Sequence, residues 1–197
     1  MKKFLLLLML PFFLSSCIIS LHPLFTSEAI IDDGRLTGIW IEQGENQESQ
    51  SSFDFKIGEN TGHYELLHTD NGSTYTYDAV LLKLGEKYYL DVILNGELCP
   101  TSNQSKADEQ YPVLAELIAS HNFYKLEFVE DQFLLYPFDG DRLEKMVKNR
   151  MIRIKHENVD GQLIITASTE ELQKFFIKYA DDEKAFEEPL VVKQMTR

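Results

Sequence analysis

The sequence has few cysteines, no second long apolar run and no excess of basic residues. Its two cysteines, Cys17 and Cys99, exclude a small scaffold held by several disulfides. After the N-terminal run, no apolar stretch is long enough to span a membrane. The formal net charge of -13 disfavours nucleic acid and anionic headgroups as partners. We therefore expect no nucleic-acid partner and a folded body that stands off an anionic membrane.

The common catalytic motifs are also missing. The sequence contains no Gly-x-Ser-x-Gly elbow, no phosphate-binding glycine loop, no Cys-x-x-Cys pair and no His-Glu-x-x-His helix. We expect no catalytic residues, no cofactor and no enzymatic activity. The alternative is a hydrolase, which would need a cleft with a histidine or carboxylate of shifted pKa.

Five histidines raise the question of a metal site. His63 and His68 fall on one predicted strand but are five residues apart, so they project to opposite faces. His22, His121 and His156 are isolated in the sequence. We expect no metal site, although a site assembled across strands stays an alternative.

The N-terminus has the pattern of a secretory signal. Lys2 and Lys3 precede the apolar run 4–13, and small residues lead to Cys17. The segment Leu14-Ser15-Ser16-Cys17 resembles the bacterial lipobox at all four positions. By that resemblance the chain is cut before Cys17, and Cys17 carries the lipid anchor. The alternatives are an ordinary signal peptide with an incidental cysteine, or an uncleaved anchor.

We divide the chain into a signal peptide (1–16), a lipidated tether (17–35) and a single domain (36–197). The processed chain of about 180 residues suits one domain with a proper core. Fully extended, residues 18–35 would reach at most about 60 Å. This segment is more apolar than a Gly/Ser linker, so we expect part of it to pack on the domain or on the membrane surface.

Most of the remaining chain reads as strands joined by short turns. Phe53, Phe55 and Ile57 alternate with polar residues, as in a half-buried strand. Asn71-Gly72 between two strand-like runs predicts a tight hairpin. We expect about nine strands, drawn from ten strand-like segments near residues 36–41, 53–57, 63–69, 74–84, 87–94, 124–128, 132–138, 151–156, 162–166 and 190–192.

Three helices are predicted, near residues 111–120, 141–149 and 169–180. Ser168 and Glu171 form a capping box at the start of the last one. Leu172, Phe175, Phe176 and Tyr179 follow at helical spacing, and Asp181 or Asp182 is expected to cap a final turn. The fold class we predict is mainly β (α+β), an antiparallel meander that closes into a barrel with a C-terminal helix packed against it.

Two blocks carry a family resemblance. The segment around Ser20-Leu21-His22-Pro23-Leu24-Phe25 with Gly38-Ile39-Trp40, and the segment from Thr166 to Asp182, resemble a group of uncharacterised bacterial lipoproteins without an assigned activity. Gly38-Ile39-Trp40 on the first strand, followed by antiparallel strands, a helix and a short closing strand, also resembles the lipocalins, which implies a lipocalin-like barrel. That resemblance implies that Trp40 plugs the closed end of the barrel under a late arginine, for which Arg150 and Arg153 are the candidates. The lipocalin Thr-Asp-Tyr turn is absent, and a helix near 111–120 departs from that pattern.

Aromatic residues are frequent on the predicted strands. In a small barrel they form either a filled core or the lining of a cavity for a small apolar or amphipathic ligand. The residues we predict for such a lining are Tyr64, Tyr75, Tyr77, Tyr88 and Tyr124.

The sequence thus predicts an envelope lipoprotein that acts as a non-catalytic binding module. It is attached to a membrane through lipid on Cys17. Ile18 follows Cys17, and no aspartate retention signal stands there. By resemblance to enterobacterial lipoprotein sorting, this favours the outer membrane, with the domain facing the periplasm. The alternative is an interaction module for an envelope protein partner, with an exposed apolar patch on the helix 169–180 or on residues 18–31.

Overall fold

The structure is a computed structural model that describes residues 19–43, 51–95, 120–159 and 162–195. The signal peptide, Cys17, Cys99 and the helix expected near 111–120 lie outside the described residues, apart from residue 120. Among the described residues, no helix has the length and apolar character needed to cross a bilayer.

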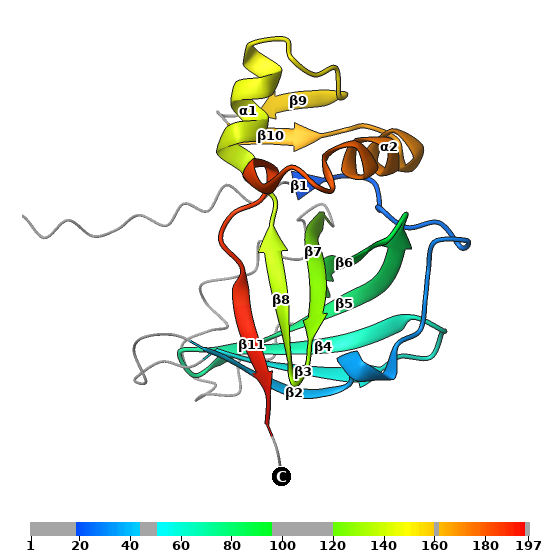
Figure 1. Cartoon of the computed structure of the whole chain (residues 1–197), viewed down its shortest axis with the longest axis vertical. Coiled ribbons are helices and arrows are strands. Elements are labelled where there is room, and N and C mark those ends of the chain that lie inside the picture. The colour runs from blue at the N-terminus through cyan, green and yellow to red at the C-terminus, as the bar shows by residue number, and fades with distance from the viewer. Residues whose placement is uncertain (1–18, 44–50, 96–119, 160–161, 196–197) are drawn as a thin grey trace, which may run out of the picture.

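Eight antiparallel strands form a closed barrel (Figure 1). The sheet runs in the order β6-β5-β4-β3-β2-β11-β8-β7, and a further pairing of β6 with β7 closes it. The predicted fold class is therefore confirmed. The strands are β2 (Gly38–Glu42), β3 (Ser52–Ile57), β4 (His63–Asp70), β5 (Ser73–Leu84), β6 (Lys87–Leu94), β7 (His121–Val129), β8 (Gln132–Pro137) and β11 (Leu190–Gln194).

Local sequence explains most of this barrel. Asn71 and Gly72 join β4 to β5 with φ values of 49° and 78°, as a two-residue hairpin turn requires, so the predicted hairpin is confirmed. Alternate residues point inward and form one core. It contains Leu36, Trp40, Phe53, Phe55, Tyr64, Leu66, Ala79, Leu81, Leu90, Val92, Leu126, Phe133, Leu135 and Val192.

One end of the barrel is closed by Trp40 and a short 3-10 helix, η1 (Gly34–Leu36). The Trp40 indole N–H donates to the Leu36 carbonyl oxygen at 2.8 Å, and its ring lies 4.5 Å from that of Phe133. The Arg35 guanidinium sits 4.1 Å from the centre of the Phe128 ring. The arginine at this end thus comes before the first barrel strand, whereas Arg150 and Arg153 follow α1 (Gly140–Lys148) at the other end of the molecule (Figure 1).

A second core lies outside the barrel, between its wall and two helices. The helix α2 (Thr169–Tyr179) packs on β6 and β7, where Phe176 lies edge-on to Tyr89 and Phe123. Together with α1, β1 (Ile19–Ser20), β9 (His156–Val159), β10 (Gln162–Ile165) and η3 (Glu183–Ala185), it forms the upper part of Figure 1. This outer core consists of Leu24, Leu82, Leu84, Tyr89, Phe123, Phe138, Leu143, Ile154, Ile165, Ala167, Leu172, Phe175, Phe176, Ala185 and Phe186.

Capping residues set the helix starts that the sequence predicts. The Ser168 hydroxyl and the Glu171 carboxylate satisfy each other's backbone N–H groups in a capping box. Asp139 caps α1 and Asp182 caps η3. The capping box and the final turn after Asp182 are therefore confirmed.

The segment before η1 is packed on the domain over much of its length. β1 pairs with both β10 and β7, and Leu24 is fully buried. The Leu24 N–H donates to the buried Asp91 carboxylate at 2.7 Å. Further along, Ile30 forms a β-bridge with Leu82. The expectation that part of the tether packs on the domain is confirmed for these residues.

Three local predictions are wrong. The strand expected at 151–156 begins only at His156, because the preceding residues fold back so that Ile154 enters the outer core. Ile57, expected on a buried face, is 69% exposed because β3 ends there. The described residues contain eleven strands rather than about nine. The unforeseen β1 pairs in parallel with a strand more than 140 residues away, which local sequence does not encode.

Candidate functional site

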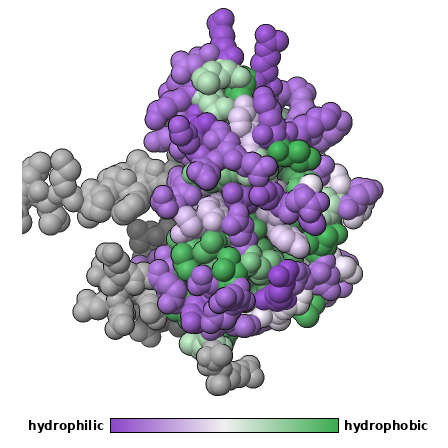
Figure 2. Space-filling view, viewed as in Figure 1, coloured by the Kyte–Doolittle hydropathy of each residue, from purple (hydrophilic) through white to green (hydrophobic). Residues whose placement is uncertain are grey.

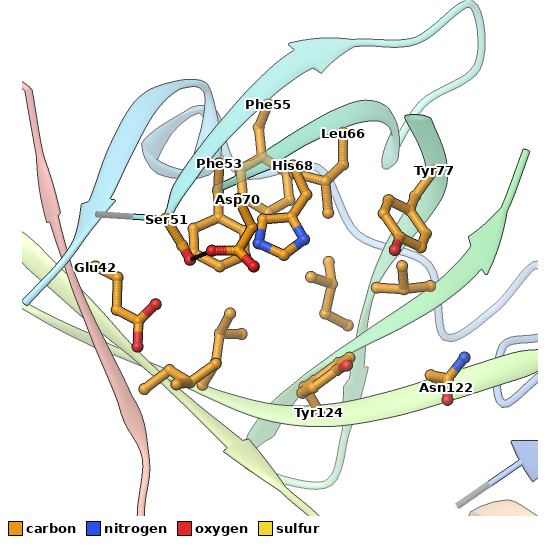
Figure 3. A pocket seen from close by; sticks show the side chains of 14 residues that line it. Glu42, Ser51, Phe53, Phe55, Leu66, His68, Asp70, Tyr77, Asn122 and Tyr124 are labelled. Carbon is orange, nitrogen blue, oxygen red and sulfur yellow. Dashed lines mark hydrogen bonds between the residues drawn. The ribbon is translucent and has the colours of Figure 1, made fainter. Parts of the chain in front are cut away.

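A cavity opens at the barrel end opposite Trp40. We call it the mouth cavity, and its volume is about 360 Å³. It lies where β2, β4 and β6 end and where β3, β5 and β7 begin (Figure 3). The barrel strands therefore enclose a space that is filled at one end and hollow at the other.

The depth of the mouth cavity is apolar. Phe55 and Leu90 are almost fully buried, and Leu66, Val92 and Leu135 are about 5% exposed, so their side chains face the cavity rather than bulk water. The complete lining is Glu42, Ser51, Phe53, Phe55, Leu66, His68, Asp70, Tyr77, Leu90, Val92, Asn122, Tyr124, Leu135 and Leu190.

Polar side chains gather at the rim. His68 stacks on Phe53, with ring centres 4.6 Å apart and planes 2° from parallel. Beside it the Ser51 hydroxyl donates to the Asp70 carboxylate at 2.9 Å (Figure 3). Glu42 reaches the cavity from β2. The hydrogen bonds found among the described residues include none to the His68 imidazole, which contacts the rings of Phe53 and Tyr77.

Burial sets the charge of His68. It lowers the pKa of the imidazole from its ordinary 6.5, and the carboxylates of Asp70 and Glu42 act in the opposite direction with smaller effect. His68 is therefore neutral near pH 7, with one nitrogen that donates and one that accepts. The rim thus presents a neutral imidazole together with the carboxylates of Asp70 and Glu42.

Ser51, His68 and Asp70 resemble the residue types of a hydrolytic triad, but their arrangement differs. In a triad the histidine bridges the nucleophile and the carboxylate. In this structure Ser51 donates directly to Asp70, while His68 stacks on Phe53. Among the hydrogen bonds of the described residues, the Ser51 hydroxyl therefore has a carboxylate as its acceptor and no imidazole, which is not the geometry of a triad.

The five predicted tyrosines separate along the barrel axis. Tyr77 and Tyr124 line the mouth cavity. Tyr64 lies toward the closed end, where its hydroxyl donates to Asp32 at 3.1 Å. Tyr88 packs there on Phe128, with ring centres 5.7 Å apart, and Tyr75 is 37% exposed beyond the cavity. Strand alternation places a side chain on the inner face but does not give its height in the barrel, so only two of the five lie at the site.

Sequence reasoning missed the polar rim. For His68 the sequence predicts only a face of its strand, opposite to that of His63. The structure agrees, because His63 contacts Phe25 outside the barrel while His68 stacks on Phe53 inside it. The rim could have been located from the distance between each inward-facing residue and the end of its strand. Inward-facing residues next to the predicted hairpin at Asn71 and Gly72, such as His68 and Asp70, must lie at one mouth.

Two shallower depressions lie outside the barrel. One, of about 500 Å³, contains His63, Phe25 and the pair Asp91–His121, whose side chains are 2.7 Å apart. His121 is therefore partnered rather than isolated. Burial raises the pKa of Asp91, while hydrogen bonds from His121 and Leu24 oppose that rise. No group of three or more potential ligands within the described ranges is arranged to hold a metal ion.

Comparisons with known proteins give no relative. No family model matches the chain, and neither the curated proteins nor the solved structures include a match. The resemblance to uncharacterised bacterial lipoproteins therefore stays a prediction, and function has to be argued from the site alone.

Proposed function

We propose that the protein is a lipid-anchored envelope protein whose barrel binds a small apolar or amphipathic ligand. The observation that carries this proposal is the mouth cavity, a hollow of about 360 Å³ with an apolar interior and a few polar groups at its rim. Ligand sites in proteins have this size range and this distribution of polarity. A barrel serving only as a scaffold would gain stability by filling this space.

The anchor would hold the domain close to the bilayer. If Cys17 carries lipid, a single residue separates it from β1, which is paired into the sheet. Two residue steps span at most about 7 Å. The acylated terminus would thus lie beside β1 and β10 rather than at the end of a long tether, with the domain on the periplasmic side of the outer membrane.

A binding test follows from the position of Val92 and Ile93 on opposite faces of β6. Val92→Phe adds bulk to the mouth cavity, whereas Ile93→Phe adds the same bulk to the outer face of the barrel. The probe is 1-naphthylamine, an uncharged dye small enough for this volume, whose emission shifts to shorter wavelengths in apolar surroundings. We expect the dye to bind the unaltered protein and Ile93→Phe with similar affinity, and to bind Val92→Phe at least about tenfold more weakly. Equal binding by both variants would contradict the proposal.

The alternative is an interaction module for another envelope protein. The apolar stripe of α2, expected to be an exposed patch, is buried in the outer core through Leu172, Phe175 and Phe176. The face seen in Figure 2 is mostly hydrophilic, with apolar areas that are small and separate. These observations favour the ligand-binding proposal over one based on an apolar docking face.

A further inference from the structure

We propose that the mouth cavity selects amphipathic ligands with a cationic head, such as a primary alkylamine, over alkyl carboxylates of the same length. This inference rests on the proposed function, because it requires that the cavity admit an apolar chain. It adds the charge of the head group, which the apolar interior alone does not define.

The charged side chains that the described residues place at the rim are all acidic. Glu42 and Asp70 contribute carboxylates, and the described residues that line the cavity include no lysine and no arginine. A carboxylate head placed at the rim would meet two like charges in a partly desolvated site. An ammonium head at the same place would meet two opposite charges.

Hydrogen bonding favours the same head group. An ammonium group offers three donors and no acceptor. The rim offers acceptors in Glu42, in Asp70 and in the imidazole of His68, which makes no hydrogen bond among the described residues. The Ser51 hydroxyl already donates to Asp70. A carboxylate head, which only accepts, could pair with the donating nitrogen of His68 but with neither rim carboxylate.

The cavity volume limits the length of the chain. At about 30 Å³ for each non-hydrogen atom, the share of one water molecule in the liquid, the cavity has room for about twelve such atoms. A ten-carbon chain with a small head group matches this number. Its tail would contact Leu66, Leu90, Val92 and Leu135, and its head would lie at the rim.

The test compares decylamine, decan-1-ol and decanoate by isothermal titration calorimetry at pH 7.5, below their micelle concentrations. The amine is protonated and the acid ionised at this pH. With about threefold from each rim carboxylate, we expect the amine to bind about tenfold more tightly than the alcohol, and the acid more weakly than the alcohol. Equal affinities for all three would overturn the charge selection and leave the proposed function standing. Absence of binding by all three would overturn both.

Variants separate the rim from the acidity of the whole protein. Glu42→Gln should weaken amine binding about threefold and leave alcohol binding unchanged. Glu42→Lys, whose ammonium group offsets the Asp70 carboxylate, should bring the affinities of the acid and the amine to about the same value. The control, Glu65→Gln, removes the same charge from an exposed site on the outer face of β4 and should change none of the affinities. If Glu65→Gln weakened amine binding as much as Glu42→Gln, attraction to the net charge would explain the preference and the proposal would fail.

Discussion

Asp91 fixes the N-terminal segment to the barrel, and its replacement by alanine is a sensitive test of this description. The side chain is 2% exposed. One carboxylate oxygen accepts the Leu24 N–H at 2.7 Å, and the other lies 2.7 Å from the His121 Nδ1. Asp91→Ala removes the acceptor of both hydrogen bonds at once. It leaves a buried backbone N–H and a nearly buried imidazole without an acceptor.

The magnitude follows from those two losses. A buried donor left without its partner costs about 1–3 kcal/mol. Leu24 is fully buried and should be near the upper end, while His121 retains some exposure and can recruit water. We therefore expect Asp91→Ala to lower the free energy of unfolding by about 3–4 kcal/mol.

Urea unfolding measures this loss, and hydrogen exchange at the Leu24 amide locates it. The matched control is Asp78→Ala on the neighbouring strand β5, whose carboxylate is exposed on the same outer face. Its effect should stay within about 0.5 kcal/mol. If the two variants were equally stable, or if protection of the Leu24 amide were unchanged in Asp91→Ala, the reasoning would be refuted.

Three further predictions concern the anchor, the packed segment and the rim. Cys17→Ala should move the protein from the membrane fraction to the soluble fraction, and pelleting with membranes in both forms would contradict the lipid anchor. Gly62→Ala should destabilise the protein by at least about 2 kcal/mol in urea unfolding, because Gly62 has φ of +71° and a Cβ would collide with the Ile31 carbonyl; an unchanged midpoint would contradict that contact. Burial lowers the pKa of His68 in the folded state, so the unfolded state binds its proton first as the pH falls. The unaltered protein should therefore lose stability relative to His68→Gln as the pH drops below 6.5, with a slope of at most about 1.4 kcal/mol per pH unit, and parallel pH profiles would contradict it.

Local sequence was sufficient for the barrel strands and the helix starts. The hairpin at Asn71 and Gly72 requires two adjacent residues that tolerate positive φ. The capping box requires a serine at the N-cap, Ser168, and a glutamate at the third helical position, Glu171. These features depend on neighbours within a few residues. The closed, mainly β fold follows from the succession of such hairpins along the chain.

Features that depend on distant contacts could not be predicted. The alternation of side chains along a strand predicts that Tyr64 and Tyr77 face inward, but it does not predict which of them lies at the mouth cavity. Arg35 takes its place over Phe128 because η1 folds under the barrel. The pairing of Asp91 with His121 joins residues 30 positions apart. To predict any of these features, one would have to know how the strands pair and in which register.

The central claim is that a ligand enters the barrel at the mouth cavity, and methyl-resolved NMR tests it most directly. Titration with decan-1-ol should shift the methyl signals of Leu66, Val92 and Leu135, which line the cavity. The methyl signals of Leu143 and Leu172, in the outer core, should stay in place. Shifts confined to the outer core, or no shifts at saturating alcohol, would contradict the account.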